Sequence, residues 1–392
     1  MGGGLLQLVA YGAQDVYLTG NPQITFFKAV YRRHTNFAIE AIQQTFNGTP
    51  GFGQRVTSTI ARNGDLINRV YLAVYVYNPD AGLSKFFGLR LLNYVEVEIG
   101  GQKIDKHYSH WMYIWNELSL PKSKQDGYRK MVGAAGGTGI KKLYVPLEFW
   151  FCRNVGLALP LIALQYHEVK INLNFESKAN CGASAATFNA SLWVDYIFLD
   201  TDERRRFAQL SHEYLIEQLQ FTGSEGVTGS SMKTKLSFNH PCKELVWFAT
   251  NSDNTMWMNY TTSSSASTLD ALEPNTRDTT TNPIATAKLQ LNGNDRFSER
   301  NGVYFNMVQP FQHHENVPSN AGINVYSFAL KPEEHQPSGT LNMSRIDSAI
   351  LNFTMNSSIS NANYSKYSIN VYAVNYNVLR IMSGMGGIAY SN

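Results

Sequence analysis

Two short segments place histidines beside acidic side chains, a combination that could bind a metal ion. They hold Asp105, His107, His110, His313, His314 and Glu315. Zinc sites use histidine nitrogens and carboxylate oxygens, but a site brings three or four such ligands together. The spacing supplies no third ligand, and adjacent residues of a strand point to opposite faces. We therefore predict histidines that pack in loops or at the surface, and no bound metal.

The glycine-rich segment "VGAAGGTGIKK" at 132–142 invites comparison with a phosphate-binding loop. It lacks the G-x-x-x-x-G-K-S/T spacing that surrounds phosphates with backbone N–H groups and a lysine. The chain also has no G-x-S-x-G, H-E-x-x-H or dinucleotide-binding pattern. We predict a protein that is not an enzyme and uses no cofactor. A pair of carboxylates brought together by folding, as in a glycosidase, stays open as an alternative.

The cysteines indicate a reducing compartment. Cys152, Cys181 and Cys242 cannot all pair within one chain and lack the spacing of a zinc site. The N-terminus shows no basic segment followed by an apolar core, so no secretion signal is predicted. The most apolar segment, 147–164, contains an arginine and a proline and would span a bilayer poorly.

Sequons for N-glycosylation recur along the chain. They begin at Asn47, Asn189, Asn259, Asn342, Asn352, Asn356 and Asn363. A chain rich in Asn, Ser and Thr produces such triplets by chance. Without a secretion signal we expect unmodified asparagines, with glycosylation at these positions as the alternative.

Charge argues against direct binding of nucleic acid. The net charge is only +3, and charged residues make up 16% of the chain against about 25% in typical soluble domains. Nucleic-acid coats usually show a clustered basic surface and a higher pI. Here the basic clusters are short, at 32–33, 141–142 and 204–206. They are typical of solvated surfaces.

The elements that must position these residues are mostly short strands. In "VKINLNF" (169–175) apolar and polar residues alternate, and "RVYLAVYVY" (69–77) shows the same period of two. Turn residues separate these runs. The pattern predicts antiparallel sheets with one buried face per strand.

The order of strands occurs twice, at an offset of about 180 residues. The matching segments are 43–49 and 219–225, 59–75 and 235–251, 95–102 and 287–294, 159–175 and 336–355, and 192–205 and 369–382. Shared order at a near-constant offset indicates two tandem copies of one all-β domain.

Helices and long loops punctuate the strands. We predict a helix that begins at Pro22 after an Asn21 cap, a second over 110–118, and a third that starts at Asp200 with Glu203 as its capping partner. Two polar insertions, 121–142 and 251–283, are expected to be long loops on the outer surface and early sites of proteolysis.

Four segments together resemble the major capsid proteins of nucleocytoplasmic large DNA viruses. They are "GAQDVYLTGNPQITFFKAVYRRHTNFA" (12–38), "GGQKIDKHYSHWMYIWNEL" (100–118), "FNHPCKELVWF" (238–248) and "NYNVLRIMSGMGGIAYSN" (375–392). They span both halves in the expected order, with no departure from the family's motifs.

The resemblance implies an all-β double jelly roll with short helices in the arm, loops and linker. Residues 1–38 would be an N-terminal arm, 39–200 the first eight-stranded jelly roll, 201–217 a helical linker and 218–392 the second. It also implies a homotrimer that acts as a pseudo-hexagonal capsomer in the icosahedral shell of a large double-stranded DNA virus. Such a protein would be located in the virion and assembled in the host cytoplasm.

The arm is the candidate site of assembly. Its proposed contact residues are Pro22, Phe26, Phe27, Tyr31, Arg32 and Arg33. The aromatic side chains would bury against the base of the same or a neighbouring subunit, and the basic ones would meet the inner layer of the shell. Expected partners are neighbouring capsomers, minor capsid proteins and an internal viral membrane. The alternative is an intramolecular strut that only covers the base of the subunit.

Two other functions compete with this interpretation. A carbohydrate-binding or carbohydrate-cleaving jelly roll would use aromatic platforms, for which Trp193, Trp247 and Trp257 are candidates. A minor capsid or spike protein of the same virus class is the closer rival. The double length and the complete set of motifs favour the major protein.

Overall fold

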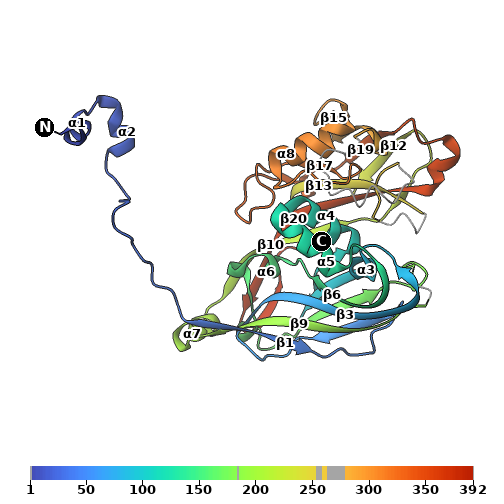
Figure 1. Cartoon of the computed structure of the whole chain (residues 1–392), viewed down its shortest axis with the longest axis horizontal. Helices are drawn as coiled ribbons and strands as arrows, with labels where there is room; N and C mark the ends of the chain where they lie inside the picture. Colours follow the sequence, from blue (N-terminus) through green and yellow to red (C-terminus); the bar gives the residue numbers. More distant parts are fainter. Residues whose placement is uncertain (1, 183–184, 253–257, 263–278, 392) are drawn as a thin grey trace. The chain divides into compact units, whose positions relative to one another are not determined.

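The computed structural model describes residues 2–182, 185–252, 258–262 and 279–391. The chain forms two compact units, an arm of residues 1–36 and a body of residues 37–392. The arm contains helix α1 (Gly3–Val9), the 3-10 turn η1 (Ala13–Asp15) and helix α2 (Val16–Thr19). Everything else belongs to the body, which Figure 1 shows as sheets with short helices between them.

Two antiparallel sheets are built from residues 37–199. The first has the order β1 (Phe37–Gln44), β9 (Thr187–Leu199), β3 (Leu66–Leu83) and β6 (Gly137–Pro146), with β7 (Leu159–Pro160) beside β3. The second has the order β2 (Arg55–Thr59), β8 (Val169–Phe175), β4 (Leu92–Ile99) and β5 (Gln102–Tyr108).

Two further sheets are built from residues 212–388 in the same way. One has the order β10 (His212–Phe221), β20 (Tyr367–Met382), β13 (Pro241–Asn251) and β17 (Asn324–Ser327). The other has the order β12 (Ser231–Leu236), β19 (Ala349–Met355), β14 (Ile284–Leu291) and β15 (Asn294–Asp295). Short strands flank them at β11 (Glu225–Gly226), β16 (Arg300–Asn301), β18 (Leu341–Asn342) and β21 (Met385–Ile388).

The two halves therefore share one connectivity. In the first half, β1 pairs with β9, β9 with β3, and β3 with β6. In the second half, β10 pairs with β20, β20 with β13, and β13 with β17 in the same order. This is the jelly-roll order, and it confirms both the predicted all-β class and the predicted internal repeat. The predicted alternation is visible in β8, where Val169, Ile171, Leu173 and Phe175 are buried.

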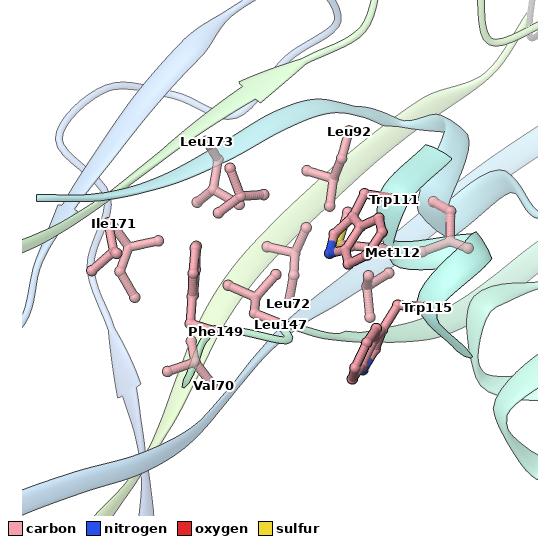
Figure 2. Close-up of a cluster of buried hydrophobic side chains, with 14 of the residues drawn as sticks. Val70, Leu72, Leu92, Trp111, Met112, Trp115, Leu147, Phe149, Ile171 and Leu173 are labelled. Atoms are coloured by element: carbon pink, nitrogen blue, oxygen red, sulfur yellow. The ribbon is translucent and has the colours of Figure 1, made fainter. Parts of the chain in front are cut away.

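The largest hydrophobic core fills the first jelly roll and continues into the second. Figure 2 shows part of it, where Ile171 and Leu173 of β8 lie on the side of Phe149 and Leu72 of β3 lies closer to Trp111. The same cluster includes side chains of the second jelly roll, namely Ile216, Val246, Phe248, Tyr372, Val374, Leu379 and Ile381. A separate cluster fills the second jelly roll around Trp247.

Helices lie between strands and at the ends of sheets. Their bounds are α3 (Phe87–Arg90), α4 (Ser109–Ser119), α5 (Lys122–Val132), α6 (Trp150–Arg153), α7 (Thr201–Gln209) and α8 (Gln309–His313). Short 3-10 segments are η2 (Val155–Leu157), η3 (Leu161–Ala163), η6 (Thr279–Thr281), η8 (Met343–Arg345) and η9 (Asn361–Lys366), and η7 (Tyr304–Val308) is a π turn. In the described part of the chain, no helix is long and apolar enough to cross a membrane.

Two of the predicted helices are present. Helix α4 covers the predicted 110–118 and buries its apolar stripe. Helix α7 begins as predicted, because the Asp200 side chain accepts the N–H of Thr201. Glu203 pairs with Arg206 at 3.3 Å instead of closing a capping box. The expected helical linker over 201–217 is too long, since residues from His212 form β10 and pair with β20.

The expected loop at 121–142 is wrong. Residues 122–132 form α5, which buries Tyr128 and Val132, and residues from Gly137 form strand β6 beside β3. Buried aromatic and aliphatic side chains on one face stabilise this helix more than its polar composition opposes it. Most of the other expected loop, 251–283, lies outside the described residues. Of its described part, Met258 and Tyr260 are buried.

Candidate functional site

The arm carries an unusual number of exposed apolar side chains. Its helices and the extended segment after them leave Leu5, Leu6, Leu8, Val9, Tyr11, Val16, Tyr17, Leu18, Ile24, Phe26, Phe27, Val30 and Tyr31 exposed. Soluble monomers rarely keep so much contiguous apolar surface in water, and such surfaces mark sites of interaction. The arm can therefore bind a partner by burying these apolar side chains against it.

The six predicted contact residues all lie in the extended part of the arm. Phe26, Phe27 and Tyr31 are 86%, 98% and 89% exposed, and Pro22, Arg32 and Arg33 are also exposed. The helix predicted from Pro22 is wrong, because the described residues 20–36 contain no helix. Asn21 adopts a left-handed conformation with φ of 50°, which directs the chain away from a right-handed helix before Pro22.

The seam between the jelly rolls is aromatic at its centre. Helix α4 and the end of β5, from the first jelly roll, cover one face of the sheet β10-β20-β13-β17. The ring of Tyr372 lies 5.7 Å from that of Trp111 and 6.0 Å from that of Tyr108, while Phe248 lies 5.6 Å from His110. Such pairs add about 0.5–1.5 kcal/mol each beyond the area they bury. The seam therefore holds the two jelly rolls as one body.

A buried ionic network crosses the same seam. Glu217 of β10 contacts Arg153 of α6 at 2.8 Å and Lys243 of β13 at 2.7 Å. The Lys243 side chain is fully buried and also donates to the carbonyl of Pro332. Sequence reasoning missed this network, because its members are far apart in the chain and belong to no motif.

A second charged cluster surrounds His314 in the second jelly roll. Its Nε2 lies 3.0 Å from a Glu244 oxygen, and its Nδ1 lies 2.8 Å from Glu333. Burial alone would lower the pKa of His314, but the two carboxylates outweigh it and raise the pKa to about 9. Burial would raise the pKa of Glu244, yet His314 and Lys243 bring it below its ordinary value. His314 is thus a structural cation.

The expectation that the candidate histidines pack in loops or at the surface is wrong for two of them, because His107 is buried in β5 and His110 is half-buried in α4. His107 contacts Asp105 at 2.8 Å and stacks on Phe149, whereas His110 bonds the Tyr260 hydroxyl at 2.7 Å. Burial lowers the pKa of His110 to about 4, so it packs as a neutral ring. Within the described ranges, no three His, Cys, Asp or Glu side chains are arranged to hold a metal.

The glycine-rich segment and the cysteines are also structural. Residues 132–142 form the end of α5, a turn with glycines at positive φ, and the start of β6. Lys142 lies over the ring of Tyr75, 5.6 Å from its centre. Cys152, Cys181 and Cys242 are free thiols, and burial raises the pKa of Cys181 to about 12. A thiol with that pKa is a poor nucleophile.

The asparagines of the sequons fall into three groups by their exposure. Asn47, Asn189, Asn342 and Asn363 are exposed, whereas Asn352 and Asn356 are half-buried and donate side-chain hydrogen bonds. Asn259 is buried, and its side-chain oxygen accepts bonds from Thr261. The four exposed asparagines are the ones whose amide nitrogens a glycosylating enzyme could reach in the folded chain.

Comparison with known proteins agrees with this geometry. Residues 25–200 match the family model "Major capsid protein N-terminus", and residues 203–387 match "Large eukaryotic DNA virus major capsid protein". The chain is 56% identical to the major capsid protein of Pyramimonas orientalis virus and 49% identical to that of Paramecium bursaria Chlorella virus 1, each over the full length of both chains.

Solved structures give the same result. A chain of the quasi-atomic model of the PBCV-1 virus capsid is 45% identical, with a TM-score of 0.84 over 94% of this chain and 100% of that one. The Faustovirus major capsid protein is only 14% identical, yet its TM-score is 0.75 over 95% of this chain and 94% of that one. The second likeness concerns the fold alone.

Proposed function

Because the chain belongs to the family of large eukaryotic DNA virus major capsid proteins, we propose that three copies form a pseudo-hexagonal capsomer that tiles an icosahedral shell. The chain is a structural protein of the viral capsid and not an enzyme, since the relatives that it matches over their full length are structural. The proposal concerns the association of three chains into one capsomer and the tiling of the shell by these capsomers.

One observation carries the proposal: a single chain contains the same sheet connectivity twice, and the two copies pack into one body. Three such chains around a threefold axis would place six similar domains in a ring. A ring of six similar domains has a nearly hexagonal outline and can contact equivalent neighbours on every side. That property is what a shell made of one abundant protein requires.

The mass of the purified protein in solution tests the trimer. One chain has a mass of 44.0 kDa, so light scattering without cross-linker should give about three times that value. Electron microscopy of the same sample should show particles with a hexagonal outline. A clean monomer at high concentration would contradict a preformed trimer, and a glycan-binding screen would then test the carbohydrate-binding alternative.

We also propose the division of the chain that the repeat predicts. Residues 1–38 are the arm and 39–200 the first jelly roll, while the predicted connection 201–217 shortens to α7 and the residues just after it, because β10 (His212–Phe221) is already the first strand of the second jelly roll. The split of the strands between 37–199 and 212–388 supports a boundary inside α7.

The arm is proposed as the element that joins capsomers to one another and to the inner layer of the shell. Phe26, Phe27 and Tyr31 supply rigid aromatic side chains, the type that dominates interface energies. Arg32 and Arg33 supply charges for acidic partners. Minor capsid proteins and anionic lipids of an internal membrane both offer such groups. The low net charge favours no direct contact with the genome.

Deleting residues 1–25 should abolish or weaken assembly of capsomers while the body still folds. The body is a separate compact unit with its own cores, so its thermal unfolding should be unchanged. Assembly is measured by sedimentation of shells or sheets after co-expression with the inner-layer proteins. Phe26→Ser combined with Phe27→Ser changes two predicted contact residues that the deletion retains and should weaken assembly as well, and Gln23→Ser serves as the control. Loss of soluble protein on deletion would favour the strut alternative.

The location follows from this role. As a capsid protein the chain is part of the virion, and we propose that it assembles in the host cytoplasm. Three free thiols, two of them buried, agree with folding in a reducing compartment.

A further inference from the structure

A groove in the body is lined by uncharged residues only. It is formed by residues of three segments that lie far apart in the chain, 163–166, 208–211 and 381–384. Its volume is about 590 Å³. Every residue of these segments is uncharged, and the side chains of Tyr166, Leu210 and Met382 are exposed. We call this surface the α7 groove, because its middle segment follows from the end of α7.

The α7 groove is preformed. The backbone N–H of Tyr166 donates to the carbonyl of Gly384 at 2.9 Å, which joins two of the three segments. Gly384 has a φ of 79°, and a Cβ at this position would lie 2.6 Å from the ring of Tyr166, so the position requires glycine. Arg62 holds the first segment by donating to the carbonyl of Leu164 at 2.6 Å. A preformed surface loses little conformational entropy when it binds a partner.

The lining favours an apolar, uncharged occupant. Two arginines that flank the groove in sequence already have partners, because Arg206 contacts Glu203 at 3.3 Å and Arg380 contacts Glu213 at 2.8 Å. Burying a charge without a partner is costly, so a charged segment would lose free energy on entering the groove. An apolar segment would instead gain free energy by covering the exposed side chains of the groove.

The arm contains a segment of this kind. Residues 1–14 carry no charged side chain. In α1, Leu5, Leu8 and Val9 are three and four positions apart, so they share one side of the helix, and none of its residues is buried. Leu8 is 78% exposed. Because a helix of seven residues is marginal in water by itself, α1 gains stability when its apolar side packs against a surface.

The length of the arm favours a groove on another copy. The body begins at Phe37, which pairs with Leu199 directly before α7, and α7 leads from there to the groove. Figure 1 shows α7 beside the start of β1 and the end of β9. Residues 10–36 can span up to about 90 Å when extended. A body of the size of residues 37–392 has a radius of gyration of only about 20 Å. The arm is therefore long enough to reach past its own subunit.

We propose that α1 binds the α7 groove of a second copy of this chain. The leucines of α1 are buried against Tyr166, Leu210 and Met382, and the flexible side chain of methionine adapts to such a partner. The exchange of arms then links subunits to one another. This inference rests on the proposed role of the arm in assembly and adds the surface on which the arm binds.

Disulfide trapping in the full chain tests this contact. Leu8→Cys and Leu210→Cys are placed in separate chains, which are co-expressed with different affinity tags, and the assembled sheets are mildly oxidised. A disulfide forms only when the two Cβ atoms come within about 4.5 Å of each other. The two chains should give a product of about twice 44.0 kDa, in which peptide mass spectrometry finds residues 8 and 210 linked.

A cysteine outside the groove is the control for this experiment. Val155 is also exposed, and Val155→Cys in place of Leu210→Cys should give about tenfold less linked product, because binding of α1 raises the local concentration only at the groove. Equal products at positions 155 and 210 would contradict a defined binding site. A link that forms only within a chain carrying both Leu8→Cys and Leu210→Cys would show that the arm packs on its own subunit. A monomeric wild-type chain in light scattering would overturn the proposed trimer, which is a separate result.

Charges in the groove provide a second test without cysteines. Leu210→Asp combined with Met382→Asp should weaken assembly about tenfold or more, because the carboxylates would be buried against α1. Both side chains are exposed in the subunit, so thermal unfolding should be unchanged. Val155→Asp is the matched control and should assemble normally. Normal assembly of the doubly charged variant would overturn the α7 groove as the binding site of α1.

Discussion

Replacing Glu217 by alanine is expected to lower the free energy of unfolding by about 3–5 kcal/mol, the usual cost of removing one partner from a buried ion pair. The substitution leaves Arg153 and the fully buried Lys243 without their carboxylate. Because water cannot reach Lys243 in the folded chain, its charge would have to be lost or exposed. Denaturant unfolding at fixed protein concentration and neutral pH measures the change.

The same strand supplies a matched control. Glu213 of β10 pairs with Arg380 at 2.8 Å, but both side chains are more than half exposed. Glu213→Ala should therefore change stability by only about 0–1 kcal/mol. Glu217→Gln keeps the shape and the hydrogen-bonding oxygen but removes the charge, so it should fall between the two alanine variants. Equal small effects at positions 213 and 217 would show that the seam does not depend on its charges.

The unfolding free energy should fall as the pH rises from about 6.5 to 9, by an amount on the order of 3 kcal/mol. His314 has its pKa raised to about 9 between Glu244 and Glu333, against 6.5 for an ordinary histidine. A raised pKa means that the folded chain holds the proton more tightly than the unfolded chain. The stabilisation is complete below pH 6.5 and is lost as the pH passes through 9.

Substitution of His314 shows how much of the pH dependence of the unfolding free energy comes from this residue. His314→Gln cannot gain or lose a proton, so its unfolding free energy should be lower at pH 6 and nearly flat up to pH 9. His313→Gln is the control, because His313 contacts the carbonyl of Leu330 instead of a carboxylate. Its profile should follow that of the unchanged chain. An unchanged slope in His314→Gln would assign the alkaline loss of stability to other groups.

Local structure was predictable where a strand has one buried and one outward face. In β8 and in the α4 helix the spacing of apolar residues alone indicates which side chains are buried, and the structure agrees. The tandem repeat was also readable, because both halves keep the same order of strands and turns. Prediction failed where packing competes with local preference. The polar segment 122–132 is a helix because Tyr128 and Val132 are buried, and no local signal records that burial.

By itself, the amino-acid sequence determined the class of the protein, its duplicated plan and the lack of catalytic motifs. Those properties depend on periodicity and order along the chain. Only the tertiary structure decided which sheet faces are covered. Tyr77 and Tyr372 both lie in β-strands of aromatic-rich sequence, yet the first is half exposed and the second is buried under α4. The pairing of Glu217 with Arg153 and Lys243 was decided in the same way. Contacts between residues far apart in the chain depend on how whole sheets pack, and local spacing does not encode that packing.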